Sequence, residues 1–176
     1  MRLYVARHGE TLWNAQNKVC GRTDLSLTER GHAQAEKLAE EAKQCNLDLI
    51  ISSPMKRALE TAGAVARACN IPISVDDRLI EQDYGIYEGV DRQDSGFLAN
   101  KRQFACKYPG GESMMQVAHR VYNLLEELKE AYPEKNVLLV CHGGVCRIIR
   151  TYFEDMTNEE FFCYSEQNAT LKEYTL

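Results

Sequence analysis

The sequence predicts an α/β sandwich built on a mostly parallel β-sheet, and two observations carry this prediction. Residues 2–7, 48–53 and 136–141 are continuous apolar runs, which are typical of parallel strands buried on both faces. Segments with apolar residues at helical spacing separate these runs, as in proteins whose helices cover both sides of a sheet. We expect one domain over residues 1–176, since this length supports a sizeable core.

The first half of the chain alternates strand, loop and helix. Residues 8–27 follow the first strand and contain turn-forming residues, so a loop is expected there. Thr28 begins a helix whose apolar residues keep helical spacing as far as Cys45. After the second strand, Ser53 is a plausible N-cap and Pro54 a plausible first residue of the next helix. The expected buried face of that helix consists of Ala58, Ala62, Val65 and Cys69.

The second half of the chain has a similar order of elements. Ser113 is expected to cap a long helix, because apolar residues recur at helical spacing from Val117 to Leu128. The other expected elements are a short strand at 73–76, a loop at 77–89, partly helical structure at 91–106, a helix from 142 to about 153 and an alternating edge strand at 168–176.

Composition and charge exclude several classes of partner. The net charge is -5 and the pI is about 5.5, which argues against a nucleic-acid or membrane-surface partner. Seven scattered cysteines without a C-x-x-C pair indicate reduced thiols. Because no export signal or membrane-spanning run is recognisable, we expect a cytoplasmic protein. For its oligomeric state we expect a monomer or a homodimer.

Basic and imidazole side chains recur where the predicted parallel strands end. The first strand ends at Arg7 and His8, Arg57 lies just beyond the second, and His142 follows the third. Ligands of such sheets bind beyond the carboxyl ends of the strands, so these four residues should meet at one edge. Arginine guanidinium groups match phosphate oxygens, and the free N–H groups at helix N-termini favour anions. The sequence therefore predicts a pocket for a small phosphorylated substrate.

The same residues suggest chemistry as well as binding. Neighbouring cations favour the neutral form of a histidine, and neutral imidazole can attack phosphorus to form a phosphohistidine. The departing alcohol then needs a proton. Glu81 follows the short strand at 73–76, and we expect it to act as the acid and later as the base that activates water.

Six motifs in order resemble those of the histidine phosphatase superfamily, also called the phosphoglycerate mutase-like family. They are ARHGETLWN, SLTERGHAQA, ISSPMKRALETA, LIEQDYGIYEG, GGES and VLLVCHGGV, and the resemblance extends over residues 3 to about 150. The resemblance implies a three-layer α/β/α fold and a reaction without metal or other cofactor.

The resemblance also implies roles for individual residues. His8 would be the phosphorylated nucleophile and Glu81 the proton donor. The phosphoryl group would be held by Arg7, Arg57 and His142, assisted by Asn14. Cys20, Gly21 and Gly143 complete the expected substrate-binding residues.

A cysteine-based mechanism is one alternative. Residues 141–147 read C-H-G-G-V-C-R and fit the phosphate loop of cysteine-dependent phosphatases, with Cys141 as nucleophile and Arg147 as phosphate ligand. This alternative leaves Arg7, His8 and Glu81 without a role. A metal held by cysteines 141 and 146 with His142 would lack a fourth ligand of plausible spacing.

Another alternative is that these residues have separate structural roles and form no site. Each residue alone has a structural explanation; Arg57, for example, could be an exposed helix arginine.

The same family chemistry serves phosphatases and mutases. Gln82 stands where the mutases have an arginine, their arginine pair is matched at best by Lys101-Arg102, and only a short segment separates Glu81 from Gly111. Cys20 and Arg22 also replace the residues expected in the mutase loop. We therefore expect a phosphomonoesterase that resembles ribazole-phosphate or broad-specificity phosphatases.

A phosphoglycerate mutase and a non-catalytic phosphate-binding module remain as alternative functions. Residues 91–108 are expected to cover the pocket, where Lys101, Arg102 and Lys107 could hold further negative groups.

Overall fold

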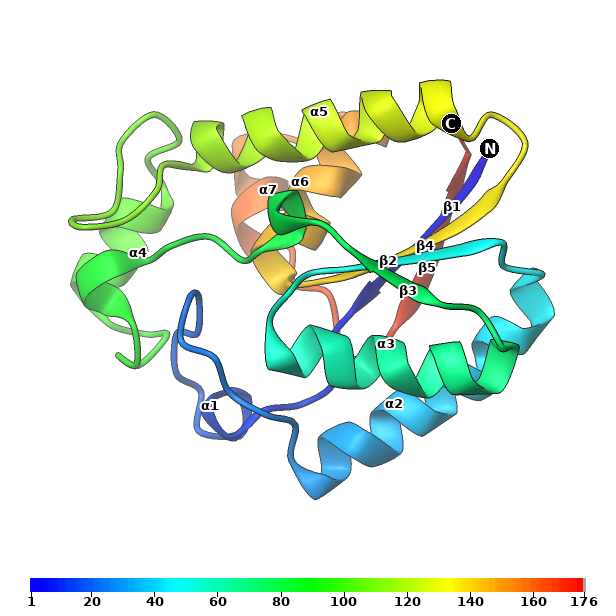
Figure 1. Cartoon of the computed structure of the whole chain (residues 1–176). Coiled ribbons are helices and arrows are strands. Elements are labelled where there is room, and N and C mark those ends of the chain that lie inside the picture. The colour runs from blue at the N-terminus through cyan, green and yellow to red at the C-terminus, as the bar shows by residue number, and fades with distance from the viewer. Residues whose placement is uncertain (176) are drawn as a thin grey trace.

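A mixed, mostly parallel sheet forms the centre of the molecule, in a computed structural model that describes residues 1–175 (Figure 1). In the described residues the strand order is β3-β2-β4-β1-β5. The first four strands are parallel to their neighbours, and β5 is antiparallel to β1. The strands are β1 (Arg2–Arg7), β2 (Leu49–Ser52), β3 (Ile73–Val75), β4 (Asn136–Cys141) and β5 (Leu171–Thr175).

Helices cover both faces of this sheet, which confirms the three-layer α/β/α fold (Figure 1). One face carries α2 (Glu29–Ala42) and α3 (Lys56–Cys69), and the other carries α5 (Met114–Ala131) and α6 (Gly143–Phe153). Alternate residues of the strands belong to different cores: Leu3 packs with the α5 and α6 side, and Tyr4 with the α2 and α3 side. This double burial explains why the strands are continuously apolar.

The register of the sheet aligns the ends of three strands. Arg7 pairs with Cys141, and Ser52 pairs with Val140. Directly beyond these pairs, the His8 N–H donates to the Cys141 carbonyl at 2.9 Å. The first residues after β1, β2 and β4 therefore lie together at the carboxyl ends of the strands, as the sequence predicted.

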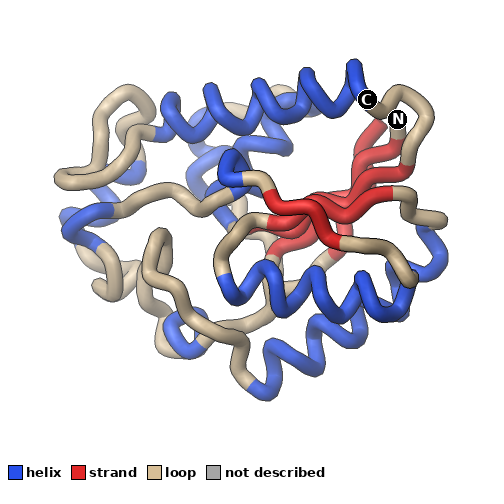
Figure 2. Tube along the Cα trace, viewed as in Figure 1, coloured by secondary structure: helices blue, strands red, loops and turns tan. Residues whose placement is uncertain are grey.

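Loops and short helices occupy the space beyond these strand ends, on the left in Figure 2. The predicted loop at 8–27 includes the short helix α1 (Leu12–Ala15), and the segment 91–106 is partly helical as expected. The helical spacing that reached Cys45 ends in a tighter 3-10 turn. The remaining short elements are η1 (Lys43–Cys45), η2 (Asp77–Leu79), η3 (Gly85–Tyr87), α4 (Ser95–Lys101) and α7 (Asn158–Cys163).

The predicted start of α3 was wrong by two residues. The helix begins at Lys56, and Met55 precedes it as an N-cap without a side-chain hydrogen bond. The Ser53 hydroxyl accepts only a long hydrogen bond from the Met55 N–H, at 3.4 Å, while it lies 2.8 Å from Nε2 of His142. A contact with a residue distant in the sequence thus replaces the local cap.

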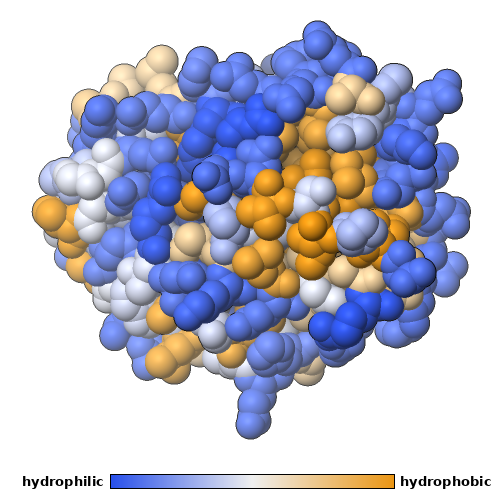
Figure 3. Space-filling view, in the orientation of Figure 1, coloured by the Kyte–Doolittle hydropathy of each residue, from blue (hydrophilic) through white to orange (hydrophobic). Residues whose placement is uncertain are grey.

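The two edge strands of the sheet are β5 and β3. β5 is an edge strand, as predicted, although the last residue of the predicted segment, Leu176, lies outside the described residues. At the other edge, Val75 of β3 is 53% exposed, and Figure 3 shows apolar side chains gathered on the viewed face, over the β3 region of Figure 1. Within residues 1–175, no helix is both long and apolar enough to cross a membrane.

Candidate active site

Arg7 ends β1 and is buried, with 8% of the residue exposed. One terminal nitrogen donates to the Glu166 carbonyl at 2.6 Å, whereas Nε is buried without any hydrogen-bond partner. Burial, followed by the nearby charge of Arg92, lowers the pKa of Arg7. An unsatisfied buried donor on a cation is costly, so this position favours an incoming anion.

His8 is buried next to Arg7, and its ring orientation follows from one hydrogen bond. Its Nδ1 lies 2.6 Å from the Gly9 carbonyl, which can only accept, so Nδ1 carries the proton and Nε2 keeps its lone pair. Burial, then the charges of Arg7 and Arg57, holds the pKa of His8 well below its ordinary value of 6.5. The imidazole is therefore neutral at pH 7 and has a free nucleophilic nitrogen.

Distant elements hold the His8 loop from two sides. The side-chain amide of Asn168 donates to the His8 carbonyl at 2.8 Å, and the Gly9 N–H donates to the Thr61 hydroxyl of α3 at 3.0 Å. Gly9 also lies so close to Gly31 that a Cβ atom would approach the Gly31 carbonyl oxygen to 2.5 Å. The glycine of the R-H-G motif thus permits close packing between this loop and α2.

Arg57 lies on the first turn of α3 and is fully buried, which contradicts its single-residue reading as an exposed helix arginine. Its guanidinium group donates to Nδ1 of His142 at 3.2 Å, to the Gly21 carbonyl at 2.7 Å and to the Thr23 carbonyl at 2.8 Å. Glu88 holds the same loop by accepting the Gly21 N–H at 3.2 Å. A buried arginine bonded only to neutral acceptors leaves a net positive charge inside the protein.

His142 completes the buried cluster. Arg57 donates to its Nδ1, so its proton is on Nε2, which lies 2.8 Å from the Ser53 hydroxyl. Burial, then the charge of Arg57, lowers the pKa of His142 well below 6.5. The His8 and His142 rings are 5.1 Å apart between centroids. The structure therefore brings together the two predicted histidines, and both are neutral.

Glu81 is 4% exposed and is positioned by two main-chain donors. Its Oε2 accepts the Gly144 N–H at 2.9 Å, at the N-terminus of α6, and its Oε1 accepts the Gln82 N–H at 2.8 Å. A Cβ atom at Gly144 would lie 2.5 Å from Glu81 Oε1. The second glycine of the H-G-G motif therefore makes room for this carboxylate.

A small cavity of about 40 Å³ lies between these groups. Four predicted residues line it: Arg7, Cys20, Glu81 and Gly143. His8, Arg57 and His142 form the buried cluster next to it rather than part of its wall. The complete lining is Arg7, Val19, Cys20, Glu81, Tyr84, Arg92, Phe97, Gly143, Gly144, Arg147 and Ser165.

Asn14 and two further arginines differ from the expectation. Asn14 is not in the cavity wall; it belongs to the capping box of α1, and its side-chain oxygen also lies 3.4 Å from the side-chain nitrogen of Asn168. Arg92 and Arg147 are in the wall. The only sequence signal for Arg147 was its place after the C-H-G-G motif, and Arg92 lies in a loop without any distinguishing pattern.

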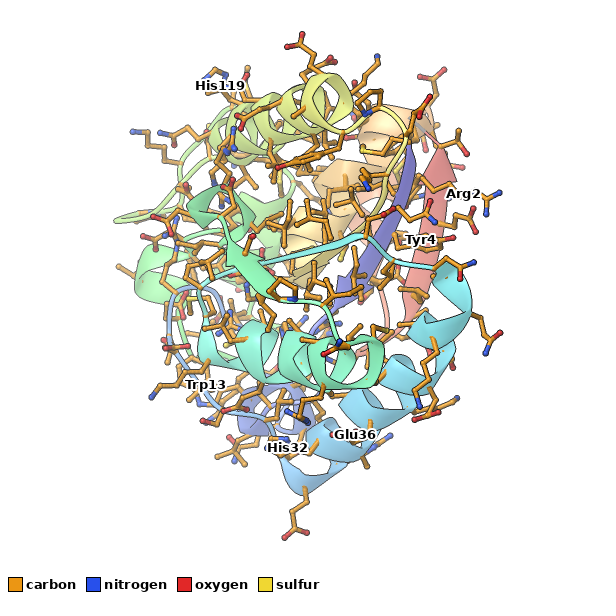
Figure 4. All side chains as sticks on the ribbon, turned by 45° about the vertical axis from the view of Figure 1, so that its right-hand side comes forward. Arg2, Tyr4, Trp13, His32, Glu36 and His119 are labelled. Carbon is orange, nitrogen blue, oxygen red and sulfur yellow. The ribbon has the colours of Figure 1, made fainter. Side chains whose placement is uncertain are left out.

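The remaining two histidines lie away from this region. Figure 4 shows His32 on α2 and His119 on α5, on the two outer layers. Among residues 1–175, no group of three histidine, cysteine, aspartate or glutamate side chains is arranged to hold a metal ion.

Cys141 does not have the environment of a cysteine nucleophile. It is fully buried at the end of β4 and belongs, with Cys146, to the apolar core on the α5 and α6 side of the sheet. Its sulfur lies 3.5 Å from that of Cys146, and this contact, followed by burial, raises the pKa of Cys146 well above 9.0. Reactive cysteines lie in accessible, electropositive positions, whereas this pair of thiols lies buried in the apolar core.

The comparisons with known proteins establish the family. The family model of the histidine phosphatase superfamily (branch 1) matches residues 3–176, so the chain belongs to this superfamily and is an enzyme of it. The chain is 36% identical over 147 residues to the uncharacterized phosphatase PhoE of Bacillus subtilis, covering 84% of this chain and 74% of that protein. It is also 36% identical over 151 residues to a probable phosphoglycerate mutase GpmB of Salmonella choleraesuis, covering 81% and 70%.

Solved structures give the same family and the same fold. A mycobacterial glucosyl-3-phosphoglycerate phosphatase in complex with VO3 superposes with a TM-score of 0.87 at 29% identity, covering 98% of this chain and 90% of that one. An alpha-ribazole phosphatase from Shigella flexneri superposes with a TM-score of 0.85 at 26% identity, covering 98% and 89%. The expected resemblance, including that to ribazole phosphatases, is confirmed.

Proposed function

We propose that this enzyme hydrolyses small phosphomonoesters through a phosphohistidine on His8. The observation that carries the proposal is the state of that imidazole: buried, neutral, and oriented by the Gly9 carbonyl so that Nε2 is free. Arg7 and Arg57 flank it, and neither forms an ion pair with a carboxylate within residues 1–175. Two uncompensated cations beside a nucleophile suit a phosphoryl group.

In the first step, Nε2 of His8 attacks phosphorus and the bond from phosphorus to the alcohol oxygen breaks. The alcohol leaves as its neutral form because Glu81 transfers a proton to the departing oxygen. The charge on the phosphoryl oxygens is balanced by Arg7, whose Nε has no partner in the protein, and by Arg57.

In the second step, Glu81 accepts a proton from a water molecule as that water attacks phosphorus. The P–N bond breaks, inorganic phosphate forms, and His8 returns to its neutral state. Glu81 is again protonated and ready for the next ester, so the two steps balance in atoms and charge.

The sharpest test of Glu81 compares two leaving groups. Glu81→Gln should lower kcat/KM for an alkyl phosphate by about 10² to 10⁴, and should affect p-nitrophenyl phosphate far less, because nitrophenolate leaves without a proton. Glu130→Gln, at an exposed position on α5, is the control. Equal losses on both esters would remove Glu81 from the acid role.

We rank hydrolysis above phosphoglycerate isomerisation. Support comes from Gln82, which takes the place of a mutase arginine, and from the phosphatases among the structural neighbours. The similarity to GpmB proteins favours the mutase as the second candidate. Incubation with 3-phosphoglycerate and a trace of 2,3-bisphosphoglycerate decides the order: phosphate release should exceed isomerisation, and the reverse would place the mutase first.

We also propose a cytoplasmic location. All seven cysteines are free thiols, which a reducing compartment preserves. A monomer or a homodimer remains our prediction for the oligomeric state, and light scattering on the purified chain tests it.

A further inference from the structure

A second chamber of about 190 Å³ adjoins the cavity that contains Glu81 and Arg7. The two share four wall residues, which are Tyr84, Arg92, Phe97 and Arg147. Lys101, at the end of α4, adds a third cation to the second chamber, and no aspartate or glutamate lines it. The rest of its wall is Gln82, Gln93, Leu98, Tyr108 and Met114.

The three cations of this chamber have no acidic partner among residues 1–175. Arg92 donates to the Lys18 carbonyl at 3.1 Å, Arg147 to the Tyr164 carbonyl at 3.1 Å, and Lys101 to the Phe162 carbonyl at 2.9 Å. Each of these bonds orients a side chain without neutralising it. Elsewhere arginines are paired with carboxylates, such as Arg78 with Asp76 at 2.7 Å.

The charges of the two arginines affect the pKa of Lys101. Burial, followed by the charges of Arg147 and Arg92, lowers its pKa to about 8. The carboxyl-free wall leaves this repulsion uncompensated, and bound anionic oxygens would relieve it.

Two buried polar atoms without partners also belong to residues of this wall. They are Oε1 of Gln82, a residue 1% exposed, and the hydroxyl of Tyr108, a residue 3% exposed. The orientation of the Gln82 amide is set because Nε2 donates to the Glu112 carbonyl at 3.2 Å. Both residues line the chamber, so its wall includes polar groups whose hydrogen-bonding capacity is not used within the protein.

We propose that this chamber is a second anion subsite, which binds a carboxylate or a second phosphate on the alcohol portion of the phosphomonoester. Arg147, Arg92 and Lys101 provide the charge that binds this group. The substrate class is a phosphomonoester with a second anionic group. This assignment rests on the proposed phosphatase function.

The subsite corrects the expectation about residues 91–108 in part. Of the three cations expected to hold further negative groups, only Lys101 lines the chamber, while Arg102 and Lys107 are exposed and outside it.

The test compares esters that differ in one group. Glycerol 3-phosphate is compared with 3-phosphoglycerate, which has a carboxylate, and fructose 6-phosphate with fructose 1,6-bisphosphate, which has a second phosphate. We expect kcat/KM to be at least about 10-fold higher for the second member of one pair, as is typical of a charged hydrogen bond. The preferred pair identifies the anion as carboxylate or phosphate, and the absence of preference in both pairs overturns the subsite.

Variants assign this selectivity to the chamber. Lys101→Gln and Arg147→Gln should lower the preference at least about 3-fold, and Arg102→Gln, one residue further along and exposed, is the matched control. Lys101 is only half-buried, so its variant tests the subsite even where Arg147→Gln fails to fold. An unchanged preference in folded Lys101→Gln and Arg147→Gln proteins contradicts the proposal.

Calorimetry on the His8→Ala protein separates this proposal from the proposed function. Tighter binding of 3-phosphoglycerate than of glycerol 3-phosphate, or of the bisphosphate than of fructose 6-phosphate, supports the subsite without any turnover. Equal affinities in both pairs overturn it, whether or not the wild-type chain hydrolyses p-nitrophenyl phosphate.

Discussion

A single methyl group at Gly144 should displace the proposed acid without damaging the fold. In Gly144→Ala the new Cβ would lie 2.5 Å from Glu81 Oε1, whereas ordinary contacts begin at 3.4 Å. Gly144 is in helix α6, so its backbone conformation accepts alanine. The carboxylate, as the end of a flexible side chain, is the group that moves.

The size of the effect follows from that movement. The carboxylate must shift by most of an ångström to restore an ordinary contact, and a misplacement of about 1 Å can cost about 10² in rate. We therefore expect kcat/KM for an alkyl phosphate to fall by about 10 to 100-fold. Stability should change by no more than about 2 kcal/mol, because the helix preference of alanine over glycine, up to about 1 kcal/mol, offsets part of the cost of straining the buried hydrogen bond from the Gly144 N–H to Glu81.

The assay compares Gly144→Ala with Gly143→Ala. A Cβ at Gly143 would lie 3.6 Å from the Arg7 guanidinium, which is an ordinary contact. Because this methyl group faces the phosphoryl side, any loss in Gly143→Ala should be smaller and equal for alkyl and nitrophenyl esters. Thermal unfolding accompanies the kinetics. If Gly144→Ala loses both esters equally while remaining folded, the placement of Glu81 beside the leaving group is refuted.

Two other predictions concern pH and metal ions. The pKa values of His8 and His142 are lowered in the folded state, so below pH 6.5 the unfolded chain binds protons that the folded chain does not. The contribution of the two histidines to the free energy of unfolding is therefore fully present above pH 6.5 and is lost as the pH falls. The loss is up to about 2.7 kcal/mol per pH unit for the two together. Urea unfolding at pH 7.5, 6.5 and 5.5 measures this slope, and a free energy of unfolding independent of pH across that range would show that the histidines are not buried as neutral groups. Turnover should also persist in EDTA, because the arginines and the α6 N-terminus supply the positive charge; loss of activity in EDTA that magnesium or zinc restores would contradict this.

The parallel core of the fold could be predicted because its strands are buried on both faces. That burial makes β1, β2 and β4 continuously apolar, and their order among helical segments indicates a parallel sheet. The start of α3 could not be predicted. A local rule assigned Ser53 as a cap, but its hydroxyl bonds to His142, 89 residues away in the sequence.

The buried cluster of arginines and histidines could be predicted to a greater extent than its surroundings. Arg7, His8 and His142 directly end strands whose register brings them together, and Arg57 follows the remaining one. Arg92 could not be found, because it lies in a loop and its site is created by contacts with α4 and α6 residues. The orphaned oxygen of Gln82 is likewise a property of the packed structure, since the sequence does not indicate which polar atoms lose their partners.

The measurement that tests the central claim most directly is the chemical identity of the phosphoenzyme. Substrate mixed with the enzyme and quenched in base should leave a covalent phosphate that acid releases, because the P–N bond of a phosphohistidine is labile once protonated. His8→Ala should abolish both this species and turnover. Cys141→Ser should retain both, with a stability loss of about 0.5 to 3 kcal/mol as for other single core changes. An inactive but folded Cys141→Ser protein together with an active His8→Ala protein would contradict the account.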